Sequence, residues 1–538
     1  MKKIRETVRL ANVPCRTINM CIKTRHIQLF IFITLASIVK SYNQQDLDPV
    51  NDQIVIYSLQ TKGNITIATT SNGEPVDIRY TSTLNKELLN NHFFLETNTH
   101  LNRKNIPLRF VHTRGSGAFG YFEVTHDITN ICRADFLDTI GKRTPIAVRF
   151  SPVFGSADTN RFPHGFAVKF YTESGNFDLV GFDTPVFIIK DPVKFPSFIR
   201  ATSRNPATNT FDSNMLWDFI TLNPESINIF MYVFGDSGIP KGYRHMTGYG
   251  IHTFQVHNKE GEVHFIRFHI IPNAGRKYFT SKEGQQLDGE DPDSFTRDLY
   301  DAIACGKEVS WKIAVQILTL EDLKKANIDI SDVTLKLPLD IYPLQPVGKI
   351  VLNRNPINYF AEIEQFAFCP SNLVRGIDGG IDKLFQARRF LYEDAQYYRL
   401  GVNKNNIEVN YPRNAKVHAY NRDGEAPVRA NERNSPNYYI NSFNGAMFSF
   451  ETDRPDLVQA VQTPPNNTAQ IAQTFKDMSM EEQERLIDNI VSSLSPSIDF
   501  IQNRAVKIFT EINPDFGERV QSGLQNSNKT KACSGILS

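Results

Sequence analysis

A block of strand patterns across residues 107–353 constrains the fold more than any other feature of the sequence. Runs such as Thr144–Phe150 (TPIAVRF) and Gly165–Thr172 (GFAVKFYT) are rich in β-branched and aromatic residues, as are Phe177–Lys190 and Glu262–Pro272. Gly, Asn, Asp and Pro separate the runs. So many strands in one block exclude an all-helical fold and predict a closed barrel or a sandwich.

The segments around this block have different patterns. Residues 42–106 are polar and rich in turn signals, which predicts an arm. Residues 354–470 show no clear periodicity, as expected of a segment that wraps a folded core. Residues 471–538 are helical, and Ser479 with Glu482 forms a possible capping box. Two amphipathic helices follow, with apolar stripes at Leu486, Ile487, Ile490, Val491 and Leu494, and at Ile498, Ile501, Ala505, Phe509 and Ile512.

Composition narrows the class of protein. The chain has 538 residues, of which 41% are hydrophobic, so it is long enough for a large core. A net charge of +1 gives no sign of a nucleic-acid partner or of an anionic membrane surface. The six cysteines show no CxxC spacing, which excludes a zinc site of that kind and a dense disulfide framework.

The N-terminus predicts export. A basic leader precedes the apolar run Ile27–Val39, and small residues place a cleavage site after Ser41, so residues 1–41 are interpreted as a signal peptide. A single membrane anchor is the alternative, but the run is shorter than the ~20 residues a spanning helix needs, and we expect no stable membrane insertion. Sequons at Asn64, Asn466 and Asn528 suit a secreted glycoprotein, and the C-terminal residues do not form a peroxisomal signal.

Two motifs carry candidate chemistry. In RFVHTRGSGAFGYFEVTHDIT (109–129), glycines follow His112, where backbone without Cβ atoms can approach a flat ligand and an imidazole can move protons. In ARRFLYED (387–394), Arg388 lies one helical turn before Tyr392 and can stabilise its phenolate. In type, order and spacing, these motifs resemble the monofunctional haem catalases.

The resemblance extends over residues 90–524 and implies a fold, a cofactor and an assembly. The fold would be α+β: an antiparallel β-barrel, an irregular wrapping segment and a C-terminal helical domain. It implies haem b, a homotetramer and the breakdown of hydrogen peroxide to water and dioxygen. Tyr392 matches the family's haem-iron ligand, Arg388 the arginine that supports it, and His252, in GYGIHTF, the histidine behind that arginine.

The resemblance assigns the remaining site residues as well. His112 matches the catalytic histidine, and Ser151, in RFSPV, matches the serine that hydrogen-bonds it. A planar guanidinium pairs well with a carboxylate, which suits arginines to the haem propionates. The matching residues are Arg109, Arg149 and Arg399 for the propionates, and Val111 and Phe195 for the apolar faces of the porphyrin.

The match fails at two places beside the catalytic histidine. The family's VGNNTP reads VGFDTP here, so Phe182 replaces the asparagine that hydrogen-bonds peroxide and Asp183 replaces its neighbour. The family's RDPRGF reads RFPHGF, so Phe162 replaces the access-channel aspartate. At the positions that form the NADPH pocket in animal members, this chain has Asn228, Ser237 and Ile271. These residues lack the donors and charges of that pocket, so NADPH binding is not expected.

Three functions follow from these residues. The first is haem-dependent breakdown of hydrogen peroxide, slowed because a lost donor costs on the order of 10²–10³ in rate. The second is a haem peroxidase whose apolar pocket favours small organic donors or organic peroxides. The third is a secreted haem-binding protein without useful turnover. Oxygen release from hydrogen peroxide separates the first from the others, and donor oxidation separates the second from the third.

Overall fold

The computed structural model describes residues 47–64, 66–84, 86–155, 157–325, 329–450, 454–460 and 463–534, and the predicted signal peptide lies outside them. The chain forms two compact units, Met1–Lys104 and Asn105–Ser538. In the first unit, the described elements are α2 (Gln53–Gln60), a 3-10 turn (Ile78–Thr81) and α3 (His92–Arg103). None of these elements has a buried residue, so the described part of this arm has no apolar core of its own.

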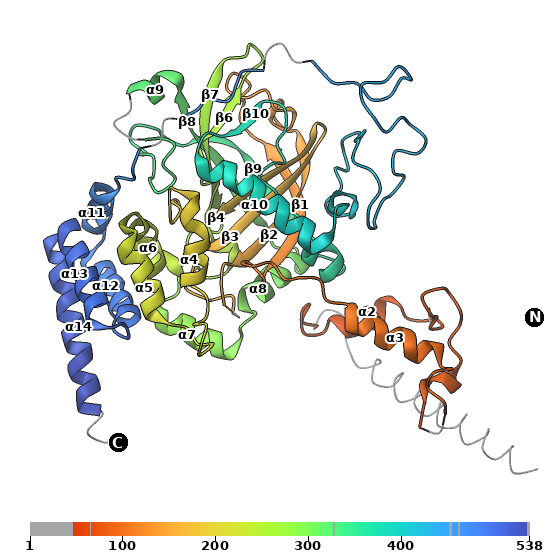
Figure 1. The fold of residues 1–538 in the computed structure, drawn as a ribbon, viewed down its shortest axis with the longest axis horizontal. Coiled ribbons are helices and arrows are strands. Elements are labelled where there is room, and N and C mark those ends of the chain that lie inside the picture. The colour runs from red at the N-terminus through yellow and green to blue at the C-terminus, as the bar shows by residue number, and fades with distance from the viewer. Residues whose placement is uncertain are drawn as a thin grey trace, which may run out of the picture. The chain divides into compact units, whose positions relative to one another are not determined.

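The second unit contains a closed β-barrel (Figure 1). Its strands are β1 (Ser116–Val124), β2 (Arg143–Pro152), β3 (His164–Thr172), β4 (Gly175–Phe182), β5 (Gly248–Tyr249), β7 (Val263–Pro272), β8 (Val309–Thr319) and β9 (Gln345–Arg354). They follow the order β7-β5-β4-β3-β2-β1-β9-β8, and β8 pairs back to β7. Every pairing is antiparallel, which confirms the predicted antiparallel barrel. Closure leaves these strands without a free edge.

One predicted strand is shorter than expected. The apolar run Phe177–Lys190 predicts a strand throughout, but β4 ends at Phe182. The segment after Phe182 instead packs its buried side chains, among them Val186 and Ile189, into a cluster formed largely by helices. Two short strands, β6 (Phe254–His257) and β10 (Ile377–Gly380), extend the sheet beyond β7.

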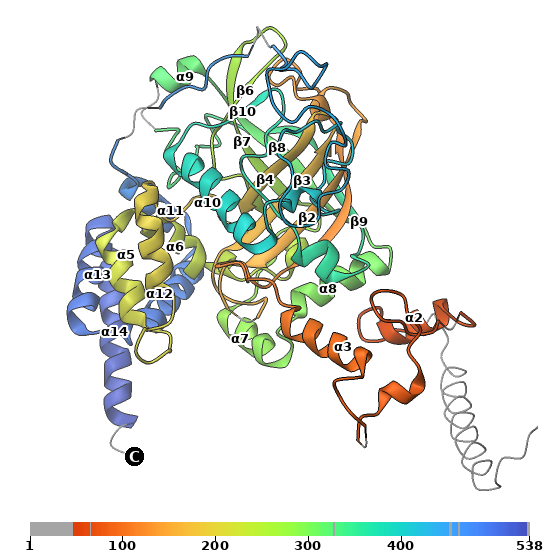
Figure 2. The same ribbon diagram turned by 45° about the vertical axis from the view of Figure 1, so that its right-hand side comes forward.

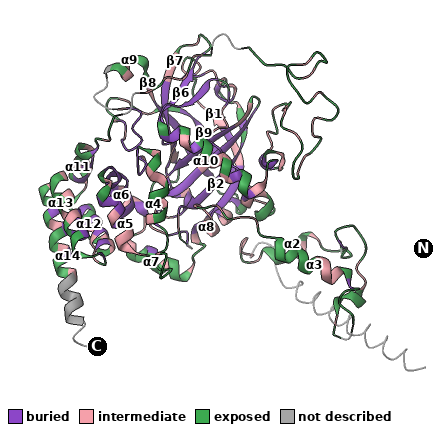
Figure 3. Ribbon diagram, viewed as in Figure 1, coloured by how far each residue is buried: buried purple, intermediate pink, exposed green. Residues whose placement is uncertain are grey.

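Aromatic side chains are prominent in the barrel core. Much of the ribbon of the barrel strands is coloured as buried in Figure 3. Phe136, Phe170 and Phe177 pack against one another, with ring centroids 5.1–5.7 Å apart. Phe150 stacks on Tyr243 at 5.0 Å. These rings are nearly or fully inaccessible to solvent, and each contributes a large apolar area to the core. The barrel interior is therefore packed solid, and the cavity described below lies beside it.

A helical region shares a second core with segments from the middle of the chain (Figures 1 and 2). Its helices are α4 (Phe195–Ala201), α5 (Ser213–Leu222), α6 (Ile227–Phe234), α11 (Thr468–Asp477), α12 (Met480–Leu494), α13 (Asp499–Ile512) and α14 (Pro514–Ser534). The predicted capping box is present, since Ser479 and Glu482 bond each other's backbone amides. Both predicted amphipathic helices are confirmed as α12 and α13. Among the helices that the structure describes, none is long and apolar enough to cross a membrane.

The segment after the barrel contains a long helix that its sequence pattern does not predict. This helix, α10 (Lys383–Leu400), buries Leu384 and Phe385 near its start, but further along it buries polar side chains, Arg388 and Arg399 among them. A helix whose inner face is partly cationic lacks the apolar stripe that marks helices in a sequence. The remaining helices are α7 (Ser281–Glu290), α8 (Ser294–Ala304) and α9 (Leu320–Lys325).

A buried ion pair in the barrel wall gives a test of the fold. The ammonium group of Lys169 lies 2.7 Å from the carboxylate of Asp178, and both side chains are at most 1% exposed. We expect Lys169→Met to lower the free energy of unfolding by about 3–5 kcal/mol, because it leaves a carboxylate buried without its cation. Chemical denaturation measures the loss. Substitution of Arg143, which is more exposed and pairs with Glu123, should leave the unfolding midpoint nearly unchanged. An equal effect of the two substitutions would contradict this account.

Candidate functional site

A chain of polar contacts fixes Tyr392 on α10. The Arg388 guanidinium donates to the Tyr392 hydroxyl at 3.1 Å and to the carbonyl of Val180 at 2.9 Å. Its other terminal nitrogen donates to Nε2 of His252 at 2.8 Å, and Nδ1 of His252 lies 2.9 Å from the Asp382 carboxylate. Arg388 is 4% exposed, so these contacts orient a cation that water barely reaches. A charged donor this close forms a strong hydrogen bond with the Tyr392 oxygen and fixes its position.

The neighbours of His252 determine which of its ring nitrogens carries the hydrogen. Nε2 accepts from a guanidinium, so the hydrogen of a neutral ring must lie on Nδ1, facing Asp382. Burial lowers the pKa of His252 despite the opposing charge of Asp382, which agrees with a neutral ring. The preceding residue, Ile251, has φ +66°, a left-handed conformation that is costly for a β-branched residue. The surrounding contacts therefore keep His252 in place although the backbone at Ile251 is strained.

On the other side of the cavity, β2 and the loop before β1 position His112. Its Nδ1 lies 3.0 Å from the Ser151 hydroxyl and 3.3 Å from the Ser151 carbonyl, which can only accept, so Nδ1 carries the hydrogen. Nε2 is thereby left as a proton acceptor. Burial, followed by the charge of Arg149, lowers the pKa of His112 to about 3. The ring is consequently neutral across the physiological range and can take a proton from a ligand. His112 has φ +60°, and its amide donates to the carbonyl of Val153.

Three arginines gather at one end of the cavity. Arg109 and Arg399 both donate to Glu364, at 3.1 and 2.8 Å. Arg149 donates to the carbonyl of His112, while its Nε is buried without a hydrogen-bond partner. Burial, and then the charges of Arg149 and Arg399, hold the pKa of Arg109 well below its usual value. Three guanidiniums beside one carboxylate favour additional anionic groups, and the unpaired nitrogen of Arg149 offers one a donor.

One cavity brings together nearly all the residues that the sequence singles out. It is lined by Arg109, Val111, His112, Arg149, Ser151, Phe162, Phe182, Phe195, Arg388, Tyr392 and Arg399, and most of its other lining is apolar. His252 lies behind Arg388, as predicted. The Phe182 ring centroid is 5.5 Å from the imidazole of His112 and 5.6 Å from the guanidinium carbon of Arg388. Phe162 meets Phe154 edge-on at 5.3 Å.

Comparisons with known proteins agree with this geometry. The family model described as Catalase matches residues 69–445. The chain belongs to the catalase family. A second model, Catalase-related immune-responsive, matches residues 462–524. The chain is 44% identical to the catalase of Mus musculus over 508 residues, covering 91% of this chain and 96% of that protein. It is 43% identical to the catalase of Drosophila melanogaster, covering 90% and 99%. The solved structure of catalase A from Saccharomyces cerevisiae has a TM-score of 0.81 at 39% identity, covering 85% of this chain and 99% of that chain.

The cavity suits the haem that the catalase family implies. Its lining is largely apolar, as a macrocycle requires. The unpaired Nε of Arg149 and the surplus of guanidinium groups suit the propionates. The Tyr392 hydroxyl borders the cavity and is bonded by a cation, as a tyrosinate ligand to ferric iron requires. The residues present therefore fit the group.

The sequence alone did not predict every residue of this site. Asp382 orients His252 and also caps α10 through the amide of Phe385, and an aspartate ahead of a helix is a recognisable N-cap signal. Glu364 holds two arginines from positions distant in sequence, and no local pattern marks it. Asp183 bonds His164 beside the cavity, and this pair too became visible only in three dimensions.

Tyr392 is the candidate ligand to the haem iron. We expect Tyr392→Phe to reduce haem occupancy strongly, because the ring remains but the ligating oxygen is lost. The ratio of Soret to protein absorbance in purified protein measures occupancy. As a matched control, Tyr398→Phe on the same helix, where the side chain is 76% exposed, should leave occupancy unchanged. Tyr392→Phe protein with an unaltered Soret spectrum would show that another residue binds the iron.

Proposed function

We propose that this protein breaks hydrogen peroxide down to water and dioxygen with haem b, and that it does so slowly. The observation that carries the proposal is the single cavity that holds His112 with Ser151, Arg388 with Tyr392, and Phe182. The first four residues supply proton transfer and cofactor binding. Phe182 stands at the position where the family's motif has a hydrogen-bond donor. Membership of the catalase family supports the reaction, and this one substitution supports the reduced rate.

The proton chemistry follows from His112. When bound, haem would supply the iron centre that exchanges electrons with peroxide. His112, neutral and with Nε2 as an acceptor, takes a proton from one peroxide oxygen and returns it to the other. Ser151 holds Nδ1 and thereby sets the plane of the ring. Burial, and then the positive charge of Arg149, lower the pKa of the imidazole and keep it neutral.

Phe182 removes a donor and adds apolar surface. A phenyl ring has no hydrogen-bonding group, so peroxide would meet polar partners on the His112 side alone. Phe182 continues a series of rings, with Phe187 at 5.8 Å, and Phe187 lies 6.3 Å from Phe195. A preorganised donor lost from a catalytic centre costs on the order of 10²–10³ in rate. The approach to the cofactor is correspondingly drier.

The same rings support a second candidate function, peroxidase activity on small organic donors or organic peroxides. Phe154 and Phe162 meet edge-on, and Phe198 lies 6.3 Å from Phe154. Apolar groups of a substrate gain roughly 25 cal/mol per Å² that they bury against such rings, whereas hydrogen peroxide has no apolar surface to bury. A haem-binding protein without turnover is the remaining alternative, and it requires that neither reaction be detectable.

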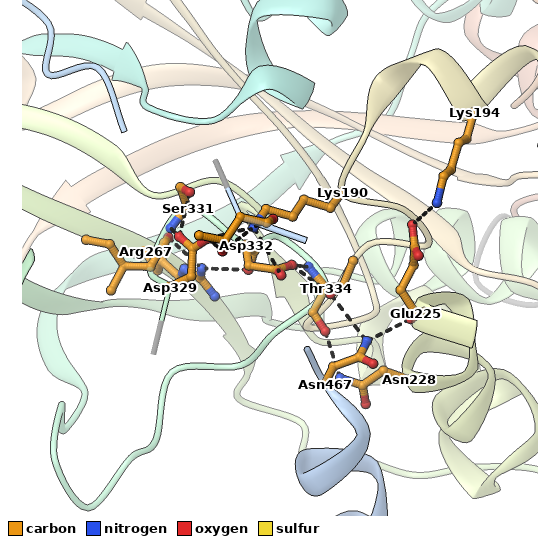
Figure 4. A network of polar contacts seen from close by, with 12 residues as sticks. Lys190, Lys194, Glu225, Asn228, Arg267, Asp329, Ser331, Asp332, Thr334 and Asn467 are labelled. Carbon is orange, nitrogen blue, oxygen red and sulfur yellow. Dashed lines mark hydrogen bonds and ion pairs between the residues drawn. The ribbon is translucent and has the colours of Figure 1, made fainter. Parts of the chain in front are cut away.

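We propose that NADPH is not a ligand. Figure 4 shows the polar network around Asn228, where lysines that could bind phosphate are already paired. Lys190 lies 2.6 Å from Asp329, and Lys194 lies 2.8 Å from Glu225. Asn228 itself is fully buried and donates to the carbonyl of Thr334 at 2.7 Å. Cations neutralised within the protein offer little to a dinucleotide phosphate.

Exposed apolar residues support a homotetramer. In the described arm, Leu84 is 91% exposed and Ile54 77%. In the wrapping segment, Ile440, Met447 and Phe450 are 87–92% exposed. Surfaces of this kind are typical of contacts between subunits, because burial against a second chain removes them from water.

We propose that the protein is secreted and glycosylated. The signal-peptide pattern supports export, and Asn64 and Asn466, two of the three predicted sequon positions, are exposed in the structure. The side chain of the third, Asn528, lies outside those the structure describes. An exposed asparagine is accessible to glycan addition once the chain enters the secretory route.

The substitution Phe182→Asn tests whether the missing donor slows the breakdown of hydrogen peroxide. We expect oxygen release per haem to rise by roughly 10-fold or more, because a donor is restored where about 2.7–4 kcal/mol of transition-state stabilisation is typical. The rise should stay below the full gain, since the smaller side chain leaves part of the phenyl volume empty. Oxygen evolution is measured with an oxygen electrode at equal haem content.

Phe182→Leu is the matched control, because it removes the ring without adding a donor. If both variants gain equally, ring bulk limits the reaction and the missing donor does not. If Phe182→Asn gains nothing while haem stays bound, the missing donor is not the cause of slow turnover. If, in addition, neither wild type nor variant releases oxygen or oxidises a donor such as guaiacol, the protein is a haem binder.

Expression in secretory cells tests whether the protein is exported. We expect the medium to contain a protein that begins near Tyr42 and loses mass on removal of N-glycans, since the leader is cleaved and exposed sequons are modified. N-terminal sequencing and an electrophoretic mobility shift measure these two features. A variant with Ile31, Ile33 and Leu35 all changed to Asp should remain in the cell without glycans. Full-length, unglycosylated wild-type protein confined to the cytosol would exclude secretion.

A further inference from the structure

A second buried ion pair lies beside the cavity. His164 is the first residue of β3 and Asp183 directly follows β4. Nδ1 of His164 lies 3.1 Å from the Asp183 carboxylate, and the side chains are 0% and 7% exposed. Two further hydrogen bonds join these residues: the His164 amide donates to the Asp183 carboxylate at 2.8 Å, and the Asp183 amide donates to the His164 carbonyl at 2.9 Å.

The contacts of His164 indicate its charge. Nε2 lies 2.9 Å from the carbonyl of Asp158, an oxygen that can only accept, so Nε2 carries a hydrogen. Nδ1 faces a carboxylate, the natural partner of a second N–H. With both ring nitrogens facing acceptors, the ring is held as an imidazolium. Although burial alone lowers the pKa of His164, the hydrogen bond and charge of Asp183 raise it overall above its ordinary value.

The chain neighbours of this pair form two walls around His112. Gly165 and Phe182 are register partners in the β3–β4 ladder. A Cβ atom on Gly165 would lie 3.0 Å from Cε1 of His112 and 2.9 Å from the Ser151 hydroxyl, so the backbone there is in close contact with the catalytic side chains. The Phe182 ring stands 5.5 Å from the His112 ring. Small movements at the ends of β3 and β4 therefore reach the reaction centre directly.

We propose that His164 and Asp183 are positioning residues, an ion pair that fixes the ends of β3 and β4. The pair holds Gly165 and Phe182 in place around the imidazole of His112. Both members depart from the family's motifs: RDPRGF has Arg at the position of His164, and VGNNTP has Asn at the position of Asp183. Arg and Asn, the family's residues at these two positions, keep their charge states near neutral pH. His164 and Asp183, which bond each other here, form a pair that can lose a proton. The inference builds on the role proposed for His112 but is tested apart from it.

Other charged and titratable groups also face the pair. They are Asp158, with Arg114 and Tyr243 on its carboxylate; Tyr249, Tyr278 and Arg276 around Asp183; and His112. Burial raises the pKa of Tyr249 to about 12 and that of Tyr243 well above its usual value. His112, with a pKa of about 3, is already neutral. His164 is thus the member of this set whose charge depends on the ion pair with Asp183, which raises its pKa.

The sign of the pH effect follows. Because the pKa of His164 is raised in the folded protein, its ion pair stabilises the fold fully below the ordinary histidine pKa of about 6.5. This contribution is lost as the pH rises through the folded pKa. Wild-type protein should therefore loosen at the ends of β3 and β4 on the alkaline side, with a parallel fall in oxygen release.

The experiment compares wild type with His164→Gln/Asp183→Asn, in which two amides preserve the hydrogen bonds without a titrating group. Amide hydrogen exchange is followed by mass spectrometry in peptides spanning residues 163–168 and 179–184, at about pH 6.5 and about pH 9.5. At each pH the measured rates are divided into the intrinsic rates calculated for each protein's own sequence, so that protection factors are compared. We expect equal exchange at the lower pH and about tenfold faster exchange in wild type at the higher pH. Peptides from α12 should exchange equally in both proteins.

A second variant and a second readout keep the outcomes distinct. His164→Arg/Asp183→Asn, which carries the family's residues, should show the same flat pH response. Equal exchange of wild type and both variants at the higher pH would overturn the proposal, even if oxygen release is normal. Faster exchange in wild type supports it, even if no protein releases oxygen, a result that would count against the proposed function alone. An alkaline fall in oxygen release that persists in both variants would likewise overturn the role of the pair in the reaction.

Discussion

The burial of positive charge around an apolar cavity is the constraint on which the rest of this site depends. Arg149, Arg388 and Arg399 are each 4% exposed, and burying a guanidinium is costly unless acceptors surround it. Glu364 supplies those acceptors for Arg399, while a neutral His252 bonded to Asp382 supplies one for Arg388. α10 therefore cannot pack as an ordinary apolar helix. Asp382 caps α10 itself and Glu364 comes from the segment that precedes it, and the remaining excess of positive charge suits a cofactor with two carboxylates.

Backbone strain marks the same site from both sides. His112 and Ile251, which precedes His252, have positive φ, and such conformations cost of order 1–3 kcal/mol in residues other than glycine. The strain persists because the barrel ladders and the hydrogen bonds to Val153 and Gly250 determine the backbone on either side. Each strained position aims an imidazole: one toward the reacting face of the cavity, the other toward the arginine that supports Tyr392. The stability of the packed barrel thus maintains two costly geometries.

The sequence predicted those parts of the fold whose side chains follow a period. β2, β3 and β7 were expected almost as they are, since alternating and β-branched runs specify strands. The apolar run after Phe182 was misread as strand, because burial alone does not distinguish a ladder from a buried loop. Of α10, only the helical turn from Arg388 to Tyr392 was expected; the rest of the helix has no apolar stripe, because arginines occupy its inner face. Within the site, motif residues were identified individually, and Asp382 carries a local N-cap signal. Glu364 and the His164–Asp183 pair depend on contacts between distant segments, which no local pattern encodes.

The division of labour among elements explains how reactivity can change while cofactor binding is retained. The groups suited to haem lie on α10, β2 and the segment before β1, and their contacts run to Glu364 and His252. The departures from the family's motifs concentrate instead at the start of β3 and the end of β4, where Phe162, His164, Phe182 and Asp183 lie. A substitution there alters the face that meets peroxide, while the hydrogen bonds of the arginines and of Tyr392 run to other residues. Apolar rings and an ion pair at these strand ends therefore adjust the reaction on a scaffold whose cofactor contacts stay unchanged.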